Sequence, residues 1–422
     1  MHLFSLNGPD LLIPLWRGKF DCDKTDSRAS WEWAVLKDNV WKQHGKTVAA
    51  CTPYIPGSFD RPPRNPAEKI NSGYKAWEFL LYLYGLGPCL FFGILPDKYW
   101  EHCCLYVRAV QLLIQKSCSP LNLVEANINL TQFSDDFELL YVQRRADRLH
   151  FVRPSIHTPS HIPHETARIG PGIIYSQWTM ERTIGNLGQE TKQHSNPYAN
   201  ISQRGVRHCQ VNALLASVPD LIPAEGPPRG SRSIGMGYMM LTATDNISRE
   251  VTVQEAKALC EFLLQHGDVR SADWEPRVVR WARIKLLNGQ IARSRWKEDG
   301  IPLSNIRTSR NVKIILEGKE HIVEVHFYLL QKIDETLHAL AVGSFYGPPH
   351  EELLRRSSNT YYTVQHQRHI DVRAFPISSI DSVVMMAPDP QYIHIFNGRE
   401  PDGTHHDRWF KMQKPGIIVS AV

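Results

Sequence analysis

Apolar residues recur at helical spacing through the first half of the chain. Within residues 29–44 they fall on one face of a period of about 3.6 residues and comprise Trp33, Leu36, Val40 and Trp41. The same period predicts further helices over residues 74–84, 97–116, 121–147, 175–190 and 202–218. Together these segments indicate an all-α bundle, with the proline-rich residues 154–172 as a connector.

The pattern changes in the second half of the chain. Proline and glycine dominate residues 219–237, which indicates a linker or a long surface loop. Residues 251–288 are expected to be helical. After about residue 310 short runs typical of β-strands follow, at residues 312–316, 321–330, 338–346, 360–367 and 379–386. The change predicts a separate small β domain.

The chain opens on a strongly apolar run that has no earlier element to pack against. The run comprises Leu11, Leu12, Ile13, Leu15 and Trp16. The run therefore resembles a segment from the interior of a larger folded unit. One interpretation is a gene-model fragment without a stable fold, because a large exposed apolar patch is rare on soluble proteins.

Composition excludes several classes of protein. With 422 residues, 42% hydrophobic and 22% charged, the chain is neither a short disulfide scaffold nor mainly disordered. The net charge of +5 permits an anionic partner without requiring one. Eight cysteines form no Cys-x-x-Cys pair and are expected to be reduced. The N-terminal residues lack the features of a signal peptide, so we expect an intracellular protein. Glycines and a proline interrupt the uncharged run 79–96, so we expect no membrane span there.

Histidines at His157, His161 and His164 suggest a metal site, because two imidazoles four residues apart share one face of a helix. Pro159 and Pro163 argue against a helix there. Loop histidines without a ligand are therefore the favoured interpretation. The segment 402–407 also combines imidazoles with carboxylates, and a polar turn is favoured there.

A basic stripe between Pro276 and Lys297 is the stronger feature. It contains no acid and seven basic residues: Arg277, Arg280, Arg283, Lys285, Arg293, Arg295 and Lys297. Trp281 and Trp296 interleave with them. Such a helical face could follow a nucleic-acid backbone. Equally, it could be a solvated face whose charges pair with acids elsewhere, and the sequence leaves both interpretations open.

Glu181 lies in an amphipathic segment rather than a polar one. Its apolar neighbours are Trp178, Met180, Ile184 and Leu187. An acid in this setting is either a residue on a helix surface or a metal ligand, and residue type alone does not decide between them.

Four segments resemble the C-terminal part of fungal DDE transposases of the CACTA and Kyakuja-Dileera-Zisupton type. They read MHLFSLNGPDLLIPLWRG, GSFDRPPRNPAEKINSGYKAWEFLLYLYG, IGPGIIYSQWTMERTIGNLGQE and NPYANISQRGVRHCQVNAL, and span roughly residues 1–215. The resemblance implies an RNase H-like core in which two Asp and one Glu hold divalent metal ions. It also implies a helical insertion between the second Asp and the Glu.

The resemblance assigns roles to two residues. Glu181 matches the family's Met-Glu-Arg helix and becomes the third acid, a catalytic metal ligand. His2 matches the end of an Asp-x-Met-His element, whose Asp would stand just before residue 1. Both partner acids are thus expected outside these 422 residues, and nothing marks Asp10 as a substitute. The implied cofactor is Mg²⁺ or Mn²⁺, which activates the nucleophile and stabilises the leaving oxygen; none is expected for this chain alone.

The predicted fold class is α+β, mainly α: a partial RNase H-like core with a helical insertion, then a small C-terminal β-barrel-like domain. The expected divisions are residues 1–28 as a core remnant, 29–153 as the insertion, 154–218 as the returning core segment with Glu181, 219–250 as a linker, 251–300 as a basic helical region, 310–390 as the β domain and 391–422 as a tail.

The function predicted from the sequence is that of a transposase-derived protein. It is related to enzymes that cut and join transposon DNA ends by two-metal chemistry, and it is inactive alone because two Asp ligands are missing. The alternative is a non-catalytic DNA- or chromatin-binding protein that uses the basic stripe and the β domain. The expected partners are DNA and either the protein's own N-terminal half or a second copy, without a membrane. The expected location is the nucleus or the cytoplasm.

Overall fold

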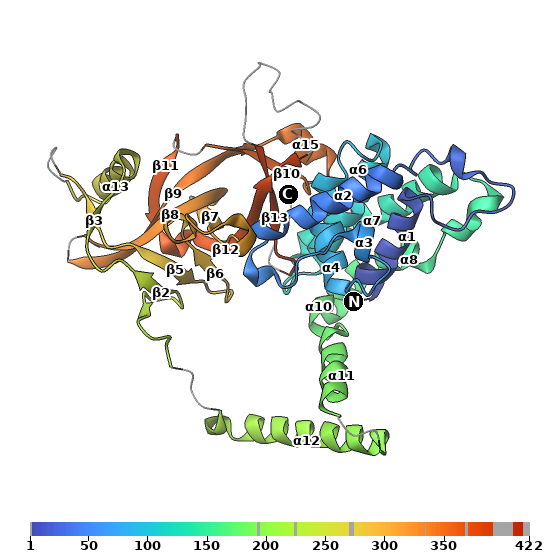
Figure 1. The fold of residues 1–422 in the computed structure, drawn as a ribbon, viewed down its shortest axis with the longest axis horizontal. Helices are drawn as coiled ribbons and strands as arrows, with labels where there is room; N and C mark the ends of the chain where they lie inside the picture. Colours follow the sequence, from blue (N-terminus) through green and yellow to red (C-terminus); the bar gives the residue numbers. More distant parts are fainter. Residues whose placement is uncertain are drawn as a thin grey trace.

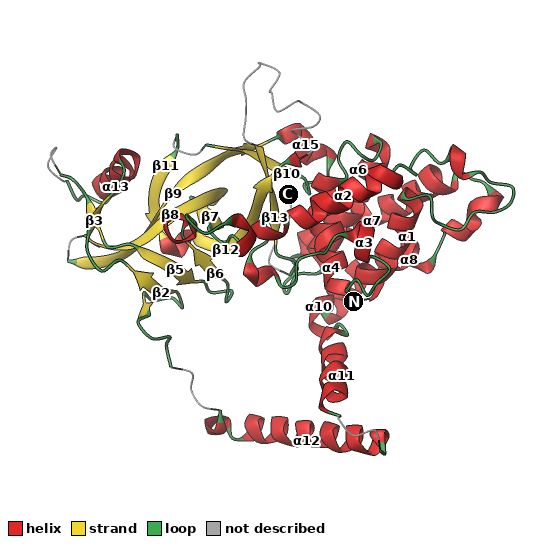
Figure 2. Cartoon of the chain, viewed as in Figure 1, coloured by secondary structure: helices red, strands yellow, loops and turns green. Residues whose placement is uncertain are grey.

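The computed structural model describes residues 2–191, 195–222, 226–269, 274–333, 335–367, 370–390 and 408–416. It is a mixed α+β fold, 49% helical and 21% strand. A helical lobe from the first half of the chain lies beside a large antiparallel sheet from the second half (Figures 1 and 2). The predicted α+β class is therefore confirmed, whereas the RNase H-like core stays a prediction.

The helical lobe is built from short helices around two long ones. Its elements are η1 (Leu3–Asn7), α1 (Gly8–Trp16), η2 (Arg28–Ser30), α2 (Asp38–Ala50), η3 (Thr52–Tyr54), η4 (Gly57–Phe59), α3 (Pro66–Lys69), α4 (Ala76–Phe79), η5 (Leu80–Leu86), α5 (Gly87–Leu90), α6 (Asp97–Leu113), α7 (Pro120–Phe137), η6 (Glu138–Val142), η7 (Ala146–Phe151), α8 (Pro154–His157), η8 (Thr158–His161), α9 (Ile162–Ile169) and α10 (Gly172–Tyr175). At the start of α7 the Ser119 hydroxyl accepts a hydrogen bond from the backbone N–H of Asn122, at 3.1 Å, and Pro120 occupies the first turn. These are the residue types that a helix start requires.

The apolar opening run is buried inside this lobe. Leu11, Leu12, Ile13, Leu15 and Trp16 are each at most 1% exposed. The Trp16 indole donates a hydrogen bond to the Tyr141 hydroxyl at 2.9 Å. The run is thus the interior of this chain, and the exposed surface that suggested an unstable fragment does not exist.

Two expectations for the first half are wrong in detail. The helix predicted over residues 29–44 begins only at Asp38, because Trp31 and Trp33 stack in the core as part of an irregular segment instead. The connector 154–172 contains α8, η8 and α9. Its prolines stand in the first turns of these short helices, where no backbone N–H is needed, so they start helices rather than prevent them.

Two further helices, α11 (Trp178–Glu190) and α12 (Pro197–Ser217), form an arm that extends away from both lobes (Figure 1). Neither contains a buried residue. The arm is held at its bend by Glu190, which pairs with Arg204 at 3.4 Å and with His208 at 3.2 Å. Within the described ranges no helix has the length and apolar character needed to cross a bilayer.

The second half folds mainly into strands that pair antiparallel. After η9 (Pro219–Leu221) its elements are β1 (Arg232–Ser233), β2 (Met239–Thr244), β3 (Arg249–Glu250), α13 (Val253–Gln265), β4 (Arg277–Val278), β5 (Trp281–Lys285), β6 (Ile291–Arg293), α14 (Arg295–Glu298), η10 (Leu303–Asn305), β7 (Asn311–Leu316), β8 (Lys319–Ile333), β9 (Thr336–Pro349), α15 (Glu351–Arg356), β10 (Tyr362–His366), β11 (Val372–Pro376), η11 (Ile377–Ser379), β12 (Ile380–Pro388) and β13 (Arg408–Gln413). Pairing follows the order β1-β2-β5-β8-β7-β12-β13-β10-β9-β11, with β6 on β5. Because β9 also pairs with β8, the strands β8, β7, β12, β13, β10 and β9 close a ring.

All five runs predicted as strands are confirmed, as β7, β8, β9, β10 and β12. The sheet is larger than predicted, however, because it also includes earlier strands and β13, which lies in the expected tail 391–422. Residues 402–407 lie outside the described residues.

The predicted basic helical region is wrong between α13 and the short α14, where the chain forms the strands β4, β5 and β6. Residues 281–285 form β5, in which Ala282 and Ile284 are buried while Lys285 is exposed. That alternation is the period of a strand. The three-residue spacing of Arg277, Arg280 and Arg283 is that of a helix face, and it misled the prediction.

One of the four hydrophobic clusters of the described residues spans both lobes. Tyr361, Met385, Phe410 and Met412 from the sheet side belong to the same buried cluster as the helical lobe. The Arg307 guanidinium donates a hydrogen bond to the Ile55 carbonyl oxygen at 2.8 Å across the junction. The sheet is therefore packed directly on the helices.

Candidate functional site

Glu181 and His2 lie together at the base of the arm. Glu181 stands in the first turn of α11, and its side chain is 48% exposed. His2 Nε2 is 4.0 Å from Glu181 Oε1, and His2 Nδ1 is 2.9 Å from Gln177 Oε1. The fold thus brings the two residues singled out by the resemblance to one corner, although they come from separate motifs.

This corner does not by itself form a metal centre. Asp10, the next acid along the chain from His2, is 73% exposed and pairs with Arg153 at 3.3 Å. In the part of the chain that the structure describes, no three His, Cys, Asp or Glu side chains group closely enough to hold a metal ion. In a two-ion phosphoryl-transfer centre the metal ions contact both the attacking and the leaving oxygen. One carboxylate cannot hold both ions. Glu181 can contribute only one of the ligands.

The histidine cluster is partly assembled. His157 and His161 lie one helical turn apart, with their Nε2 atoms 2.9 Å from each other. His164 is 81% exposed and lies 3.8 Å from Glu165 instead. The pair therefore lacks a third ligand among the described residues.

Three arginines of the basic stripe are paired with carboxylates. Arg277 contacts Glu250, and Arg280 Nε lies 2.7 Å from Asp245 Oδ2. Arg295 Nε lies 3.1 Å from Asp299 Oδ2. For these positions the structure supports the interpretation as a paired, solvated face.

The other four basic residues lie on β5, β6 and α14. Arg283 is opposite Arg293 in the β5–β6 register, and Lys285 is two residues further along β5, so all three share one face of the sheet. Arg283 donates a hydrogen bond to the Thr242 carbonyl oxygen at 2.7 Å. Lys285, Arg293 and Lys297 are exposed and have no carboxylate partner among the described residues. We call Arg283, Lys285, Arg293 and Lys297 the open cationic face.

A buried polar chain on the sheet was not predicted from the sequence. His326 Nδ1 lies 2.7 Å from Glu255 Oε1 of α13, and His326 Nε2 lies 2.8 Å from Ser344 Oγ of β9. The β8–β9 register shifts at His326, and such a bulge re-aims a side chain. Burial opposes ionisation of Glu255, but hydrogen bonds from His326 and Thr252 outweigh it and lower its pKa.

This chain of groups has the members of a serine-hydrolase triad in the wrong order. Glu255 and His326 line a pocket of about 340 Å³, whereas Ser344 is 1% exposed and does not line it. A nucleophilic serine must face the substrate, with its carboxylate behind the imidazole. Here the hydroxyl is innermost, so the arrangement serves to fix α13 to the sheet.

Two further acids, Glu324 and Glu298, lie close to the hydrogen-bonded group of Glu255, His326 and Ser344. Burial raises the pKa of Glu324, but hydrogen bonding to His366 and the charges of Arg310 and Arg295 outweigh it and bring the pKa to about 2. Burial raises the pKa of Glu298 to about 7, against the opposing hydrogen bond from the Ser309 N–H. The only sequence signal for such groups is a charged residue inside an otherwise apolar strand run, as at Glu324.

Comparison of the chain with protein-family models, curated proteins and solved structures found no match.

Proposed function

We propose that the chain is transposase-derived and related to enzymes that cut and join transposon DNA ends. The observation that carries this proposal is the 4.0 Å approach of His2 Nε2 to Glu181 Oε1. A catalytic centre requires its motif residues to be neighbours in space, and these two come from the first and the third of the four resembling segments. In this proposal Glu181 is one of three carboxylates that hold divalent metal ions, and His2 orients the start of α11 through Gln177.

We propose further that these 422 residues do not cut DNA by themselves. The resemblance places the two Asp ligands outside them, and two ions cannot be held by Glu181 alone. The apolar side chains of α11 support this: Met180 is 53% exposed and Ile184 is 57% exposed. A helix with such a surface is suited to being covered by a further part of a core.

A strand-cleavage assay on a labelled transposon-end duplex with Mg²⁺ or Mn²⁺ tests both statements. We expect no cleavage by the 422-residue chain, and cleavage by a version extended with the upstream reading frame that encodes the two Asp. In the extended protein Glu181→Gln should lower the rate by about 10³-fold or more, while Glu165→Gln, a carboxylate of α9 that pairs with Arg168, should not. Cleavage by the 422-residue chain that Glu181→Gln abolishes would refute inactivity. Cleavage insensitive to Glu181→Gln would refute its role.

The open cationic face supports a second candidate, non-catalytic DNA binding. Three of its side chains, those of Arg283, Lys285 and Arg293, share one side of the β5–β6 pair, an arrangement that could contact successive phosphates. Replacing Lys285 and Arg293 by Ala should weaken binding to all duplex sequences and reduce the salt slope by about 0.9 per lost contact. The control is Arg277→Ala, since Arg277 already pairs with Glu250. Equal affinities for all variants would show that this face is only solvated.

A further inference from the structure

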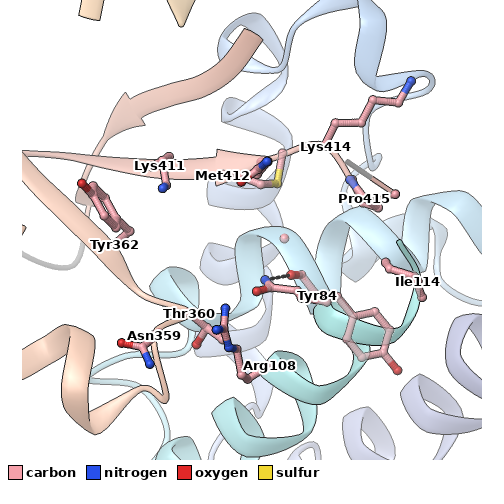
Figure 3. A pocket seen from close by; sticks show the side chains of 14 residues that line it. Tyr84, Arg108, Ile114, Asn359, Thr360, Tyr362, Lys411, Met412, Lys414 and Pro415 are labelled. Atoms are coloured by element: carbon pink, nitrogen blue, oxygen red, sulfur yellow. Dashed lines mark hydrogen bonds between the residues drawn. The ribbon is translucent and has the colours of Figure 1, made fainter. Parts of the chain in front are cut away.

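The pocket at the junction of the two lobes has a basic lining whose charges are already paired. Residues of η5, α6 and β13 line it (Figure 3). Each basic side chain there pairs with a carboxylate outside the lining: Arg108 with Glu125, Lys411 with Glu320 and Lys414 with Asp60. This pocket therefore gives no reason to expect a charged ligand, and a different group of side chains carries the inference below.

Two histidines that the proposed function does not use lie on one side of the helical segment 154–169. His157 ends α8 and His161 ends η8, and α8, η8 and α9 follow one another without a break. Because the segment is helical throughout, a spacing of four residues is about one helical turn. The backbone therefore presents both imidazoles on the same side.

Buried neighbours hold this segment in place while the two histidines stay exposed. Ile156, Pro159 and Pro163 are buried in the helical lobe. The Ser160 hydroxyl donates a hydrogen bond to the His157 carbonyl oxygen at 2.7 Å, which fixes the turn between the two imidazoles. The backbone on which the pair stands is thus rigidly anchored, although the rings themselves face solvent.

The two rings point toward one common position. The Nε2 atoms of His157 and His161 are 2.9 Å apart, and the ring centroids are 4.7 Å apart with the planes at 85°. With metal–nitrogen bonds of about 2.0–2.1 Å, two imidazoles at a right angle around one ion have nitrogens about 2.9 Å apart and centroids about 4.5 Å apart. A tetrahedral angle would give about 3.4 Å and about 5.2 Å instead. Both observed distances are nearer to the right angle.

This geometry is that of a chelating pair for a divalent transition-metal ion. Right angles between ligands are typical of square-planar and octahedral ions, such as Cu²⁺ and Ni²⁺, and imidazole suits both. The hydrogen bond between the rings would be lost on binding, but it lies at the surface, where water compensates for much of the loss. Water can also occupy the remaining coordination positions, because both side chains are exposed.

We propose that His157 and His161 bind a divalent transition-metal ion of square-planar or octahedral geometry through their two Nε2 atoms. The bound ion joins the end of α8 to the end of η8 and therefore stabilises the folded chain. This proposal does not depend on the DNA chemistry proposed for Glu181, because it uses different residues and a different class of metal ion.

Calorimetric titration of the full chain with NiCl₂, in a buffer that does not bind metal ions, tests the proposal. The chain contains 19 histidines, so each variant is compared with the wild type to separate this site from the others. His157→Gln and His161→Gln should each weaken the tightest site by about tenfold or more. The double variant should lose nothing further, because a chelate requires both rings. The matched control is His164→Gln, since His164 belongs to the same segment, is 81% exposed and should leave binding unchanged.

Thermal unfolding provides a second measurement. NiCl₂ should raise the unfolding midpoint of the wild type and of His164→Gln more than that of either pair variant. Both replaced side chains are exposed, so the variants are expected to fold, and far-ultraviolet circular dichroism checks this. The proposal is overturned if wild type and His157→Gln bind Ni²⁺ equally, or if His164→Gln loses as much affinity as the pair variants. Losses that add in the double variant would also overturn it, because they show two independent imidazoles.

Discussion

The ion pair between Asp26 and Arg148 allows a sharp test of what holds the helical lobe together. The Asp26 carboxylate accepts hydrogen bonds from Arg148 Nε and Nη2, both at 2.8 Å, and from the Trp31 indole at 2.8 Å. The two charged side chains are 0% and 1% exposed. Arg148 also donates to Gln143 Oε1 at 2.6 Å. The pair joins η7 to the loop that follows α1.

Asp26→Asn keeps the shape of the side chain but removes the charge. It leaves the Arg148 guanidinium buried without an anion, and such a loss costs about 3–5 kcal/mol of unfolding free energy. The control is Asp10→Asn, because Asp10 is 73% exposed in its pair with Arg153 and should contribute about 0–1 kcal/mol. Urea unfolding followed by far-ultraviolet circular dichroism measures both. A difference between the two variants below about 1 kcal/mol would refute the reasoning.

The pH dependence of the same pair provides an independent check. The hydrogen bond from Arg148 holds the pKa of Asp26 far below its ordinary value of 3.8. A lowered carboxyl pKa stabilises the fold above the ordinary value, and this contribution is lost as the pH falls toward the folded-state pKa. Wild-type stability should therefore decline on acidification below about pH 4. Asp26→Asn should decline less steeply, and parallel curves would contradict this assignment.

Three further changes have defined outcomes. Burial raises the pKa of Glu298 to about 7, so the unfolding free energy of the wild type should fall as the pH rises from about 4.5 to 7. Glu298→Gln should abolish this fall. Urea titrations at several pH values measure both. Gly85→Ala should destabilise the lobe junction, since its Cβ would lie 2.2 Å from Met412 Sδ, whereas Gly188→Ala, in open space on α11, should raise the thermal midpoint slightly. Thr252→Ala removes the N-cap hydrogen bond of α13 and should cost about 1 kcal/mol in urea unfolding.

Five of the six strands of the closed ring were predictable, because their apolar runs are short and bounded by turns. Residues 312–316 and 379–386 are examples, and they form β7 and β12. β5 was missed because its charged positions mask the alternation: only Ala282 and Ile284 reveal it, and two residues are too few to define a period. β13 was missed because its six residues, RWFKMQ, include Arg408, Lys411 and Gln413 and so contain no apolar run.

The candidate site was predictable only in part. The resemblance singled out His2 and Glu181 separately, and the fold places them at one corner. The chain of Glu255, His326 and Ser344 has no sequence signature, because its members are 71 and 18 residues apart and meet only once the sheet has formed. The ion pairs of the basic stripe could not be predicted from the sequence either, because Asp245, which pairs with Arg280, lies 35 residues from it in the chain.

The position of β13 between β12 and β10 determines when this protein can finish folding during synthesis. Most contacts of α6 and α7 are local, so the helical lobe can form while the later strands are still being made. The ring of strands cannot close until residue 413 has left the ribosome, and until then β12 and β10 each present an unpaired edge. A message that stops before residue 408 would make this state permanent. Its product would lack Phe410 and Met412 from the cluster that spans both lobes, and it should aggregate through the two open edges.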